Sequence, residues 1–346
     1  MTSASVRVSV FGKTDLGLTR EYNEDTFLVA DLSSGSANLH PDVRSHEVGP
    51  RGSLFMVADG MGGAAAGELA SAMAADGIYH HLSTAWAEDK EISAARFAYR
   101  MKEAVELANQ QIYAYARENP DVRGMGTTVT AAGVIGDELY LAQIGDSRGY
   151  LIRNGESFQL TRDQSLTQRL VDAGELTEEE AEQSERRNII LQALGPDPRV
   201  KVDLSRQTLR RGDILILCSD GLSGVVKREE LSQMVAQSAD LPSLCSALID
   251  LANERGGPDN VTVVAARFDG DRLPEPDSAD GAGYEVYNVP DAEISEPAPV
   301  REHSPPAPPP PAAAPPSPPE PSSRASALLI VAALVALIAL ILTALL

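Results

Sequence analysis

The segment from residue 127 to residue 153 limits the possible folds more than any other part of the chain. It contains three apolar runs of strand length, "TTVTAAGVI", "ELYLAQIG" and "RGYLIR", with only a few residues between consecutive runs. Strands joined by such short turns pair antiparallel, because a parallel neighbour needs a crossover of about a dozen residues or more. Three further runs predict strands: "SLFMVA", "DILILCS" and "VTVVAARF".

Helical patterns alternate with these strands. Apolar side chains recur at helical spacing between residues 92 and 119, which predicts a helix with one face toward a core. Residues 231–235 and 244–253 are typical of further helices, whereas residues 31–52 are typical of a surface loop insertion. We therefore expect an α/β protein of the α+β kind, with antiparallel sheets covered by helices and not a doubly wound parallel sheet.

The composition changes twice along the chain. Residues 1–270 have a globular pattern, whereas residues 271–324 contain 16 of the 23 prolines and predict a disordered linker of polyproline character. Residues 325–346 carry no charge, and about 20 apolar residues are enough to span a bilayer. We expect this run to be a transmembrane helix that anchors the chain in the cell membrane as a single pass. The catalytic domain should then be cytoplasmic, because the N-terminus lacks the apolar stretch of a signal peptide.

Charge and cysteine content exclude two classes of protein. The formal net charge of −21 disfavours nucleic-acid binding, because an acidic surface repels a phosphate backbone. The two cysteines, Cys218 and Cys245, each lie in an apolar run, which does not indicate a disulfide framework.

Acidic residues recur where predicted strands meet loops. These residues are Glu24, Asp25, Asp59, Asp146, Asp220 and Asp259. A single aspartate beside a glycine would be ordinary turn chemistry. The recurrence indicates a shared cation, because a carboxylate at a strand end is costly to desolvate unless it is paired.

The types of residue in this set favour a hard cation. Oxygen ligands select Mg²⁺ or Mn²⁺, and the scarcity of histidine argues against zinc. Two such ions held by shared carboxylates can activate water for phosphoester hydrolysis. Arg20 stands four residues before Glu24 and could bind the phosphate, although on spacing alone it could equally be a surface arginine.

Eight motifs in a fixed order carry a family resemblance. They are "RxxxED" (Arg20, Glu24, Asp25), "VADGMGG", "GMGTTVTAA", "IGDSRGYLIR", "LTRDQSLTQRLVDAGELTEEEA", "RRNIILQALG", "GDILILCSDGL" and "DNVTVV". Over residues 6–268 the chain resembles the bacterial metal-dependent Ser/Thr protein phosphatases of the PPM or type 2C family. The resemblance implies a four-layer α-β-β-α sandwich with a metal centre at one end of the sheets.

The resemblance also assigns metal ligands. Asp59 would bridge two metals, and the carbonyl of Gly60 would be a further ligand. Asp220 and Asp259 would complete one metal site, and Glu24 would contribute to the other.

Three more residues take roles from the same resemblance. Asp25 would hold a metal-bound water, and Arg20 would bind the substrate phosphate. Asp146 matches the position of a third, weaker metal in bacterial members. Residues 161–195 match the flap beside the active site.

The chain departs from the family pattern in the motifs themselves. Met61 stands where some members have a histidine that could act as a general acid, and Gln164 replaces the flap histidine. Ser184 and Glu185 replace a histidine-proline pair. Gly224 replaces an acid, and this replacement weakens the case for a fully occupied third metal site.

The leading hypothesis is a membrane-tethered protein serine/threonine phosphatase that uses two Mn²⁺ or Mg²⁺ ions. Its catalytic residues would be Arg20, Asp59, Asp220 and Asp259. Its partners would be phosphoproteins, with a Ser/Thr kinase and its targets among the candidates. The alternatives are a pseudophosphatase scaffold that binds phosphoproteins without hydrolysing them, and a phosphatase specific for a sigma-factor antagonist.

Overall fold

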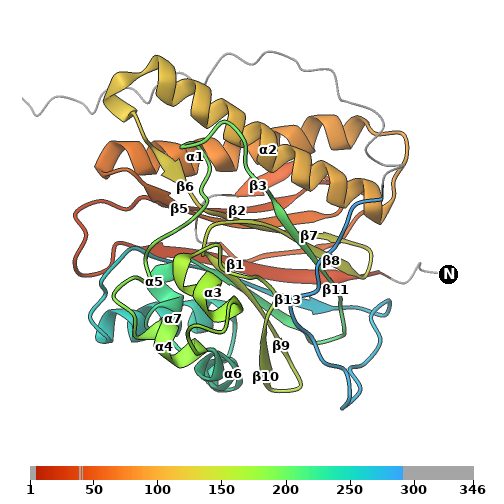
Figure 1. The fold of residues 1–346 in the computed structure, drawn as a ribbon. Helices are drawn as coiled ribbons and strands as arrows, with labels where there is room; N and C mark the ends of the chain where they lie inside the picture. The colour runs from red at the N-terminus through yellow and green to blue at the C-terminus, as the bar shows by residue number, and fades with distance from the viewer. Residues whose placement is uncertain (1–4, 39, 41, 291–346) are drawn as a thin grey trace, which may run out of the picture. The chain divides into compact units, whose positions relative to one another are not determined.

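Two antiparallel sheets lie face to face, and helices cover the outer face of each sheet (Figure 1). The computed structural model describes residues 5–38, 40 and 42–290, which belong to one compact unit. The arrangement of antiparallel sheets flanked by helices confirms the fold expected from the short turns.

The strands divide between the sheets as follows. The first sheet has the order β10 (Glu156–Gln159), β9 (Arg148–Arg153), β12 (Ile214–Cys218), β13 (Val261–Asp269), β1 (Arg7–Asp15) and β4 (Arg44–Glu47). The second has the order β11 (Asp203–Thr208), β8 (Glu138–Ile144), β7 (Val129–Ile135), β5 (Ser53–Met61), β2 (Asp25–Asp31) and β3 (Ser36–Asn38), and β6 (Gly126–Thr127) pairs with β5. The turn between β9 and β10 consists of Asn154 and Gly155, whose φ angles of 53° and 77° suit a two-residue hairpin.

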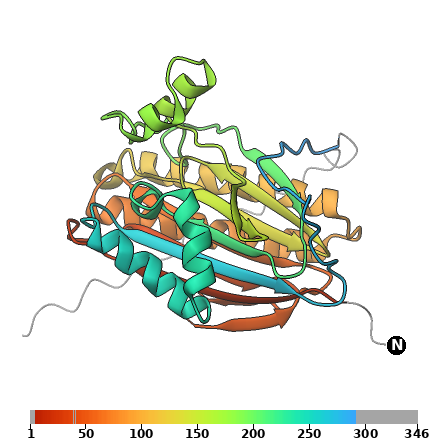
Figure 2. The ribbon, with the colours of Figure 1, turned by 90° about the horizontal axis from the view of Figure 1, so that it is seen from below.

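Helices on the two sides belong to different parts of the sequence. Those on the second sheet are α1 (Ala64–His81), η1 (Leu82–Trp86), α2 (Ala94–Glu118) and η2 (Pro120–Val122). Those on the first sheet are α5 (Asp220–Ser223), α6 (Arg228–Gln237) and α7 (Leu241–Glu254). The flap contains α3 (Leu166–Asp172) and α4 (Glu178–Glu182), which stand apart from the four layers in Figure 2.

Helix α2 illustrates how the sequence determines one of these elements. The side chain of Ser93 accepts a hydrogen bond from the backbone nitrogen of Arg96 at 3.1 Å and so caps the first turn. Phe97, Met101 and Ile112 then recur on one face and are fully buried. The helix predicted over residues 92–119 is therefore confirmed.

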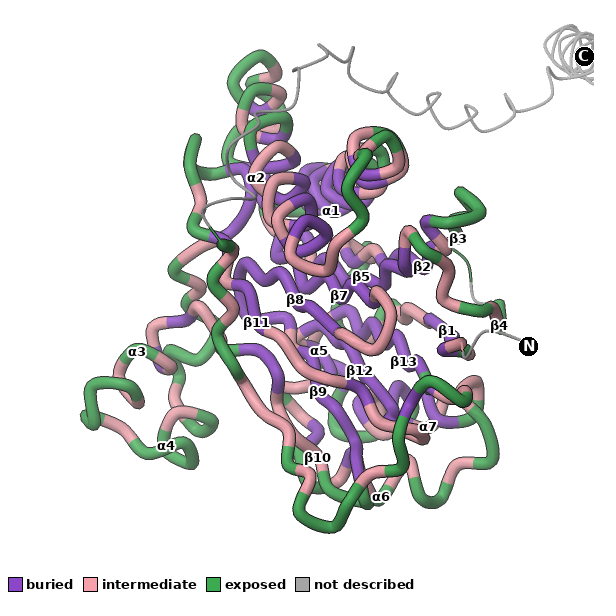
Figure 3. The backbone as a smooth tube through the Cα atoms, turned by 90° about the vertical axis from the view of Figure 1, so that its right-hand side faces the viewer, coloured by how far each residue is buried: buried purple, intermediate pink, exposed green. Residues whose placement is uncertain are grey.

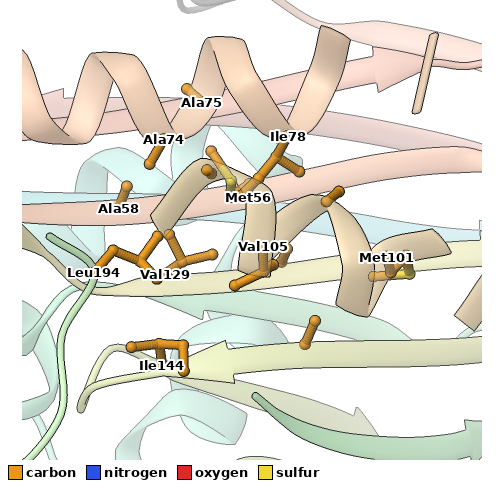
Figure 4. Close-up of a cluster of buried hydrophobic side chains, with 14 of the residues drawn as sticks. Met56, Ala58, Ala74, Ala75, Ile78, Met101, Val105, Val129, Ile144 and Leu194 are labelled. Carbon is orange, nitrogen blue, oxygen red and sulfur yellow. The ribbon is translucent and has the colours of Figure 1, made fainter. Parts of the chain in front are cut away.

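Apolar side chains fill the three spaces between the four layers. One cluster joins the second sheet to α1 and α2, and Figure 4 shows Met56, Ala74 and Val105 meeting there. A second cluster lies between the sheets, and a third joins the first sheet to α5, α6 and α7. The central strands are accordingly buried along most of their length, whereas the edge strands β3, β4 and β10 and most of the flap are partly or fully exposed (Figure 3). A rigid double sheet therefore supports the loops at its ends.

Two expectations change with the structure. Residues 31–52, predicted as a loop insertion, include β3 and β4, which pair with β2 and β1 and form an edge of each sheet. Residues 271–290, predicted as the start of the linker, pack against the domain, and Tyr287 N donates to Leu204 O at 2.8 Å. The composition of this segment resembles a linker, but its backbone hydrogen bonds join it to β11.

The rest of the predicted tail lies outside the described residues. This applies to the linker from residue 291 to residue 324 and to the transmembrane helix at 325–346. Across the residues that the structure describes, no helix has the length and apolar character needed to cross a membrane.

Candidate metal centre

Strand ends from both sheets bring the predicted acids to one place. Asp25 of β2 and Asp59 of β5 are direct partners across the second sheet. Asp220 follows β12, and Asp259 lies two residues before β13, so both come from the first sheet. Asp146 lies in the turn between β8 and β9. All four of the other carboxylates act electrostatically on Asp59, so the structure gathers these five acids.

Burial and mutual repulsion perturb the acids strongly. Burial, followed by the charges of Asp25 and Asp220, raises the pKa of Asp59 well above its ordinary value. Burial is also the main reason that the pKa of Asp25 rises to about 7 and that of Asp146 to about 8. The pKa of Glu24 is raised by burial and lowered in part by the nearby Arg20. A site with this excess of buried negative charge would be stabilised by a cation.

Several acidic oxygens in the site lack a hydrogen-bond partner. These buried atoms are Glu24 Oε1, Asp25 Oδ1 and Asp146 Oδ1. Buried oxygen atoms of this kind are the ligands that Mg²⁺ and Mn²⁺ prefer, so the residues fit a hard divalent cation. Within residues 5–38, 40 and 42–290, no three acidic, histidine or cysteine side chains are arranged as a complete ligand set. Two contacts compete with such a set: Arg20 pairs with Asp259, and Ser219 donates to Asp25.

Arg20 lies in the loop between β1 and β2 and reaches into the acidic site. Its Nη2 is 2.6 Å from Asp259 Oδ2, and its side chain is 51% exposed. The hydrogen bond to Asp259 raises the pKa of Arg20, so the guanidinium is charged. A half-exposed, charged fork beside the acids can bind an oxyanion that enters from solvent.

Asn260 is a supporting residue that the sequence argument did not single out. Its Oδ1 accepts from Glu24 N at 2.9 Å, and its Nδ2 donates to Leu16 O at 2.9 Å and to Tyr22 O at 3.0 Å. These three bonds fix both ends of the loop that carries Arg20 and the start of the segment that carries Glu24. The signal in the sequence was its place beside Asp259 in "DNVTVV".

Ser219 is a second such residue, and it holds Asp25. Its Oγ donates to Asp25 Oδ2 at 2.7 Å and accepts from Thr262 N at 3.0 Å. The bond joins the first sheet to the second at the level of the acids. Its position next to Asp220 in "CSDGL" was the corresponding signal.

Gly60 and the glycines after it determine the backbone at the site. A Cβ on Gly60 would lie 2.2 Å from the carbonyl oxygen of Gly67 and 2.5 Å from that of Glu24, so no side chain fits there. Gly62 and Gly63 have φ angles of 124° and 87°, which other residues rarely adopt. The close approach of backbone therefore occurs at Gly60, and the next glycines supply the turn into α1.

The flap is joined to the Asp146 turn by Gln164, the residue that replaces the family histidine. Gly145 N and Gln192 Nε2 each donate to Gln164 Oε1 at 2.9 Å, which ties both ends of the flap to the turn. Arg148 adds a bidentate pair with Asp163, at 2.7 Å for the shorter contact. The glutamine thus performs an anchoring role with neutral hydrogen bonds.

A cleft of about 900 Å³ connects the acids with the flap. Its lining includes Arg20, Asp146, Asp220 and Asp259 at the acidic site and residues of α3, α4 and α6 further along. Gly224 also lines it and contributes no carboxylate, as its sequence position indicated. A cleft of this size accommodates much more than a phosphate group.

Comparisons with known proteins agree with this geometry. The family model described as protein phosphatase 2C matches residues 39–257. The serine/threonine phosphatase stp of Listeria monocytogenes is 35% identical over 258 residues, which cover 74% of this chain and 94% of that protein. The serine/threonine protein phosphatase PstP of Mycobacterium tuberculosis is 39% identical over 254 residues, which cover 73% of this chain and 44% of the longer relative.

Solved structures give the same result. The crystal structure of the M. tuberculosis phosphatase PstP/Ppp superposes with a TM-score of 0.63 at 36% identity. The match covers 78% of this chain and 100% of the PstP/Ppp chain. The catalytic domain of PstP in complex with two manganese ions has a TM-score of 0.61 at 36% identity and covers 76% of this chain and 99% of its own. The chain therefore belongs to the protein phosphatase 2C family and is a serine/threonine protein phosphatase.

Proposed function

We propose that the chain hydrolyses phosphoserine and phosphothreonine in proteins with water activated by two Mn²⁺ or Mg²⁺ ions. The observation that carries this proposal is the buried acid cluster, with its unpartnered oxygens, beside Arg20 in an open cleft. The two manganese ions in the PstP catalytic domain support the choice of metal. When bound, such ions lower the pKa of water and neutralise charge on a phosphoryl group.

Each residue then has a defined task. Asp59 would hold both ions, and the Gly60 carbonyl would be a further ligand. Asp220 and Asp259 would complete one site, and Glu24 would contribute to the other. These ligands come from rigid strand ends in both sheets, so the site needs little reorganisation on substrate binding.

The remaining residues act on water and on the substrate. Asp25, which Ser219 holds at 2.7 Å, would orient water, and Asp146 would hold a weaker third ion. Arg20 would exchange its contact with Asp259 for the phosphate oxygens. Met61 cannot donate a proton, so the leaving serine or threonine oxygen would take its proton from water or from another group.

The direct test is hydrolysis of a phosphothreonine peptide by the full-length protein. We expect activity with Mn²⁺ or Mg²⁺, loss of activity in excess EDTA, and recovery when Mn²⁺ is restored. A phosphotyrosine peptide of the same sequence is the matched control and should be a poor substrate. Full activity in excess EDTA would contradict the metal-dependent mechanism, and binding of the phosphopeptide without hydrolysis would favour the scaffold.

We also propose that residues 325–346 anchor the phosphatase in the cell membrane with its catalytic domain in the cytoplasm. The support is the uncharged apolar run itself. The substrates of the phosphatase would then be phosphoproteins at the inner membrane face, with a kinase and its targets among them.

Membrane extraction tests the anchor. The full chain should sediment with membranes and resist carbonate extraction. The double variant Leu334→Arg/Leu337→Arg should be released, because each central arginine costs about 3 kcal/mol. Release of the unaltered chain by carbonate would contradict the anchor.

A further inference from the structure

Residues 280–287, near the end of the described part of the chain, form a strap along the edge of the second sheet. Arg206 N donates to Glu285 O at 3.0 Å, and Tyr287 N donates to Leu204 O at 2.8 Å. Val286 bridges Ser205 of β11, and the segment is seen in blue beside β11 in Figure 1. The ring of Tyr287 packs edge-on against that of Tyr140, with 5.0 Å between centroids. The strap is therefore bonded to the domain on one side of Tyr284.

The strap is equally well held on the other side of Tyr284. Arg210 Nε donates to Asp280 Oδ2 at 2.8 Å, and this contact lowers the pKa of Asp280 to about 2. Arg153 Nη1 donates to Gly281 O at 3.1 Å. Tyr284 thus lies between two anchored stretches of backbone.

The side chain of Tyr284 lines the same cleft as the acidic site. Its neighbours there are Arg162 at the start of the flap and Asp172 at the end of α3, which form an ion pair with each other. Burial, followed by the charge of Asp203, raises the pKa of Tyr284, so its phenol keeps its proton. A neutral, half-buried aromatic ring is therefore presented to the cleft by a segment outside the PPM motifs.

The size of the cleft leaves room for peptide beyond the phosphorylated residue. The acids and Arg20 engage only the phosphoryl group, whereas the cleft of about 900 Å³ continues to Tyr284. A tyrosine offers a large apolar ring that loses little entropy on binding and a hydroxyl for a backbone partner.

We propose that Tyr284 positions the phosphoprotein segment that flanks the phosphorylated serine or threonine. The inference rests on the proposed function, because it concerns the substrate of the same site. The strap at residues 280–287 is then part of the substrate-binding surface.

The test compares two substrates in the full-length protein with Mn²⁺. One is p-nitrophenyl phosphate, which reaches only the phosphoryl end, and the other is a nine-residue phosphothreonine peptide. Tyr284→Ala should raise the KM for the peptide about three- to tenfold with kcat unchanged, and should leave both constants for p-nitrophenyl phosphate unchanged. Tyr284→Phe should restore most of the peptide affinity, because the ring makes the contact. Tyr113→Ala on α2 is the matched control and should change neither substrate.

Three results would overturn the inference. The first is an unchanged peptide KM in Tyr284→Ala. The second is an equal loss of kcat/KM for both substrates in that variant. The third is a peptide KM in Tyr284→Phe as high as that in Tyr284→Ala. Failure of the proposed function looks different, since the unaltered protein would then show no metal-dependent hydrolysis of either substrate. Thermal unfolding of each variant checks that Tyr284→Ala keeps the native fold.

Discussion

Replacement of Asn260 by alanine should weaken both the fold and the metal site. Asn260 is 4% exposed, and its side chain makes three hydrogen bonds of 2.9 to 3.0 Å, with Glu24 N, Leu16 O and Tyr22 O. Each lost bond in a buried position costs about 1 kcal/mol, so Asn260→Ala should lower the free energy of unfolding by about 3 kcal/mol. Glu24 and Arg20 would also lose their fixed positions, so Mn²⁺ affinity should fall.

Urea unfolding and calorimetric Mn²⁺ titration measure these two effects. Asn109→Ala is the matched control, because Asn109 is also buried and bonds to Gly195 N at 2.8 Å and Asp197 O at 3.0 Å, away from the acids. It should lose about 2 kcal/mol of stability and keep its Mn²⁺ affinity. The reasoning fails if Asn260→Ala loses less than about 0.5 kcal/mol, or if its Mn²⁺ affinity falls no further than that of Asn109→Ala.

Three further predictions concern charged residues. Arg20→Ala should raise the KM for a phosphothreonine peptide about tenfold or more while Mn²⁺ still binds, because a charged hydrogen bond to phosphate contributes about 1.5–3 kcal/mol. In EDTA, the raised pKa values of Asp25 (about 7) and Asp146 (about 8), against the ordinary 3.8, mean that the protonated forms stabilise the folded state. That stability is fully present below pH about 4 and is lost as the pH rises to 7 and 8, so Tm should fall between pH 6 and 8, and Mn²⁺ should reduce the fall. Arg153→Ala should lower the free energy of unfolding by about 3–5 kcal/mol in urea, because it leaves Asp213 buried and unpaired.

Each of these predictions has a result that contradicts it. For Arg20, the result is an unchanged peptide KM. For the acids, it is a Tm in EDTA that does not fall across this pH range, or a fall of the same size with Mn²⁺. For Arg153, the reference is Arg267→Ala, which removes an exposed pair with Asp269 and should cost less than about 1 kcal/mol. Equal losses in the two variants would show that burial of the Arg153 pair has no consequence.

The sequence predicted the fold and the acids for connected physical reasons. Short turns force antiparallel pairing, and antiparallel strands return repeatedly to the same end of a sheet. An acid next to each strand end, such as Asp59 or Asp220, is therefore carried to a common place. The pattern of apolar strands was enough to expect this gathering of acids without any knowledge of how the layers pack.

The parts that were missed depend on contacts between distant residues. Asn260 bonds to Leu16 and Tyr22, which lie more than 200 residues away in sequence, and no local pattern marks such a bond. The segment at 271–290 has the composition of a linker, yet its backbone hydrogen bonds attach it to the free edge of β11. Edge pairing uses main-chain groups that every residue carries, so composition alone could not predict it.

The central claim is that the buried acids hold two divalent cations, with Asp59 shared between them. Calorimetric titration of the metal-stripped, full-length protein with Mn²⁺ measures this directly. The unaltered protein should bind two ions tightly, and Asp59→Asn should lose tight binding at both sites. Asp121→Asn, an exposed acid on η2, should bind as the unaltered protein does. An Asp59→Asn protein that still bound two ions with unchanged affinity would contradict the account.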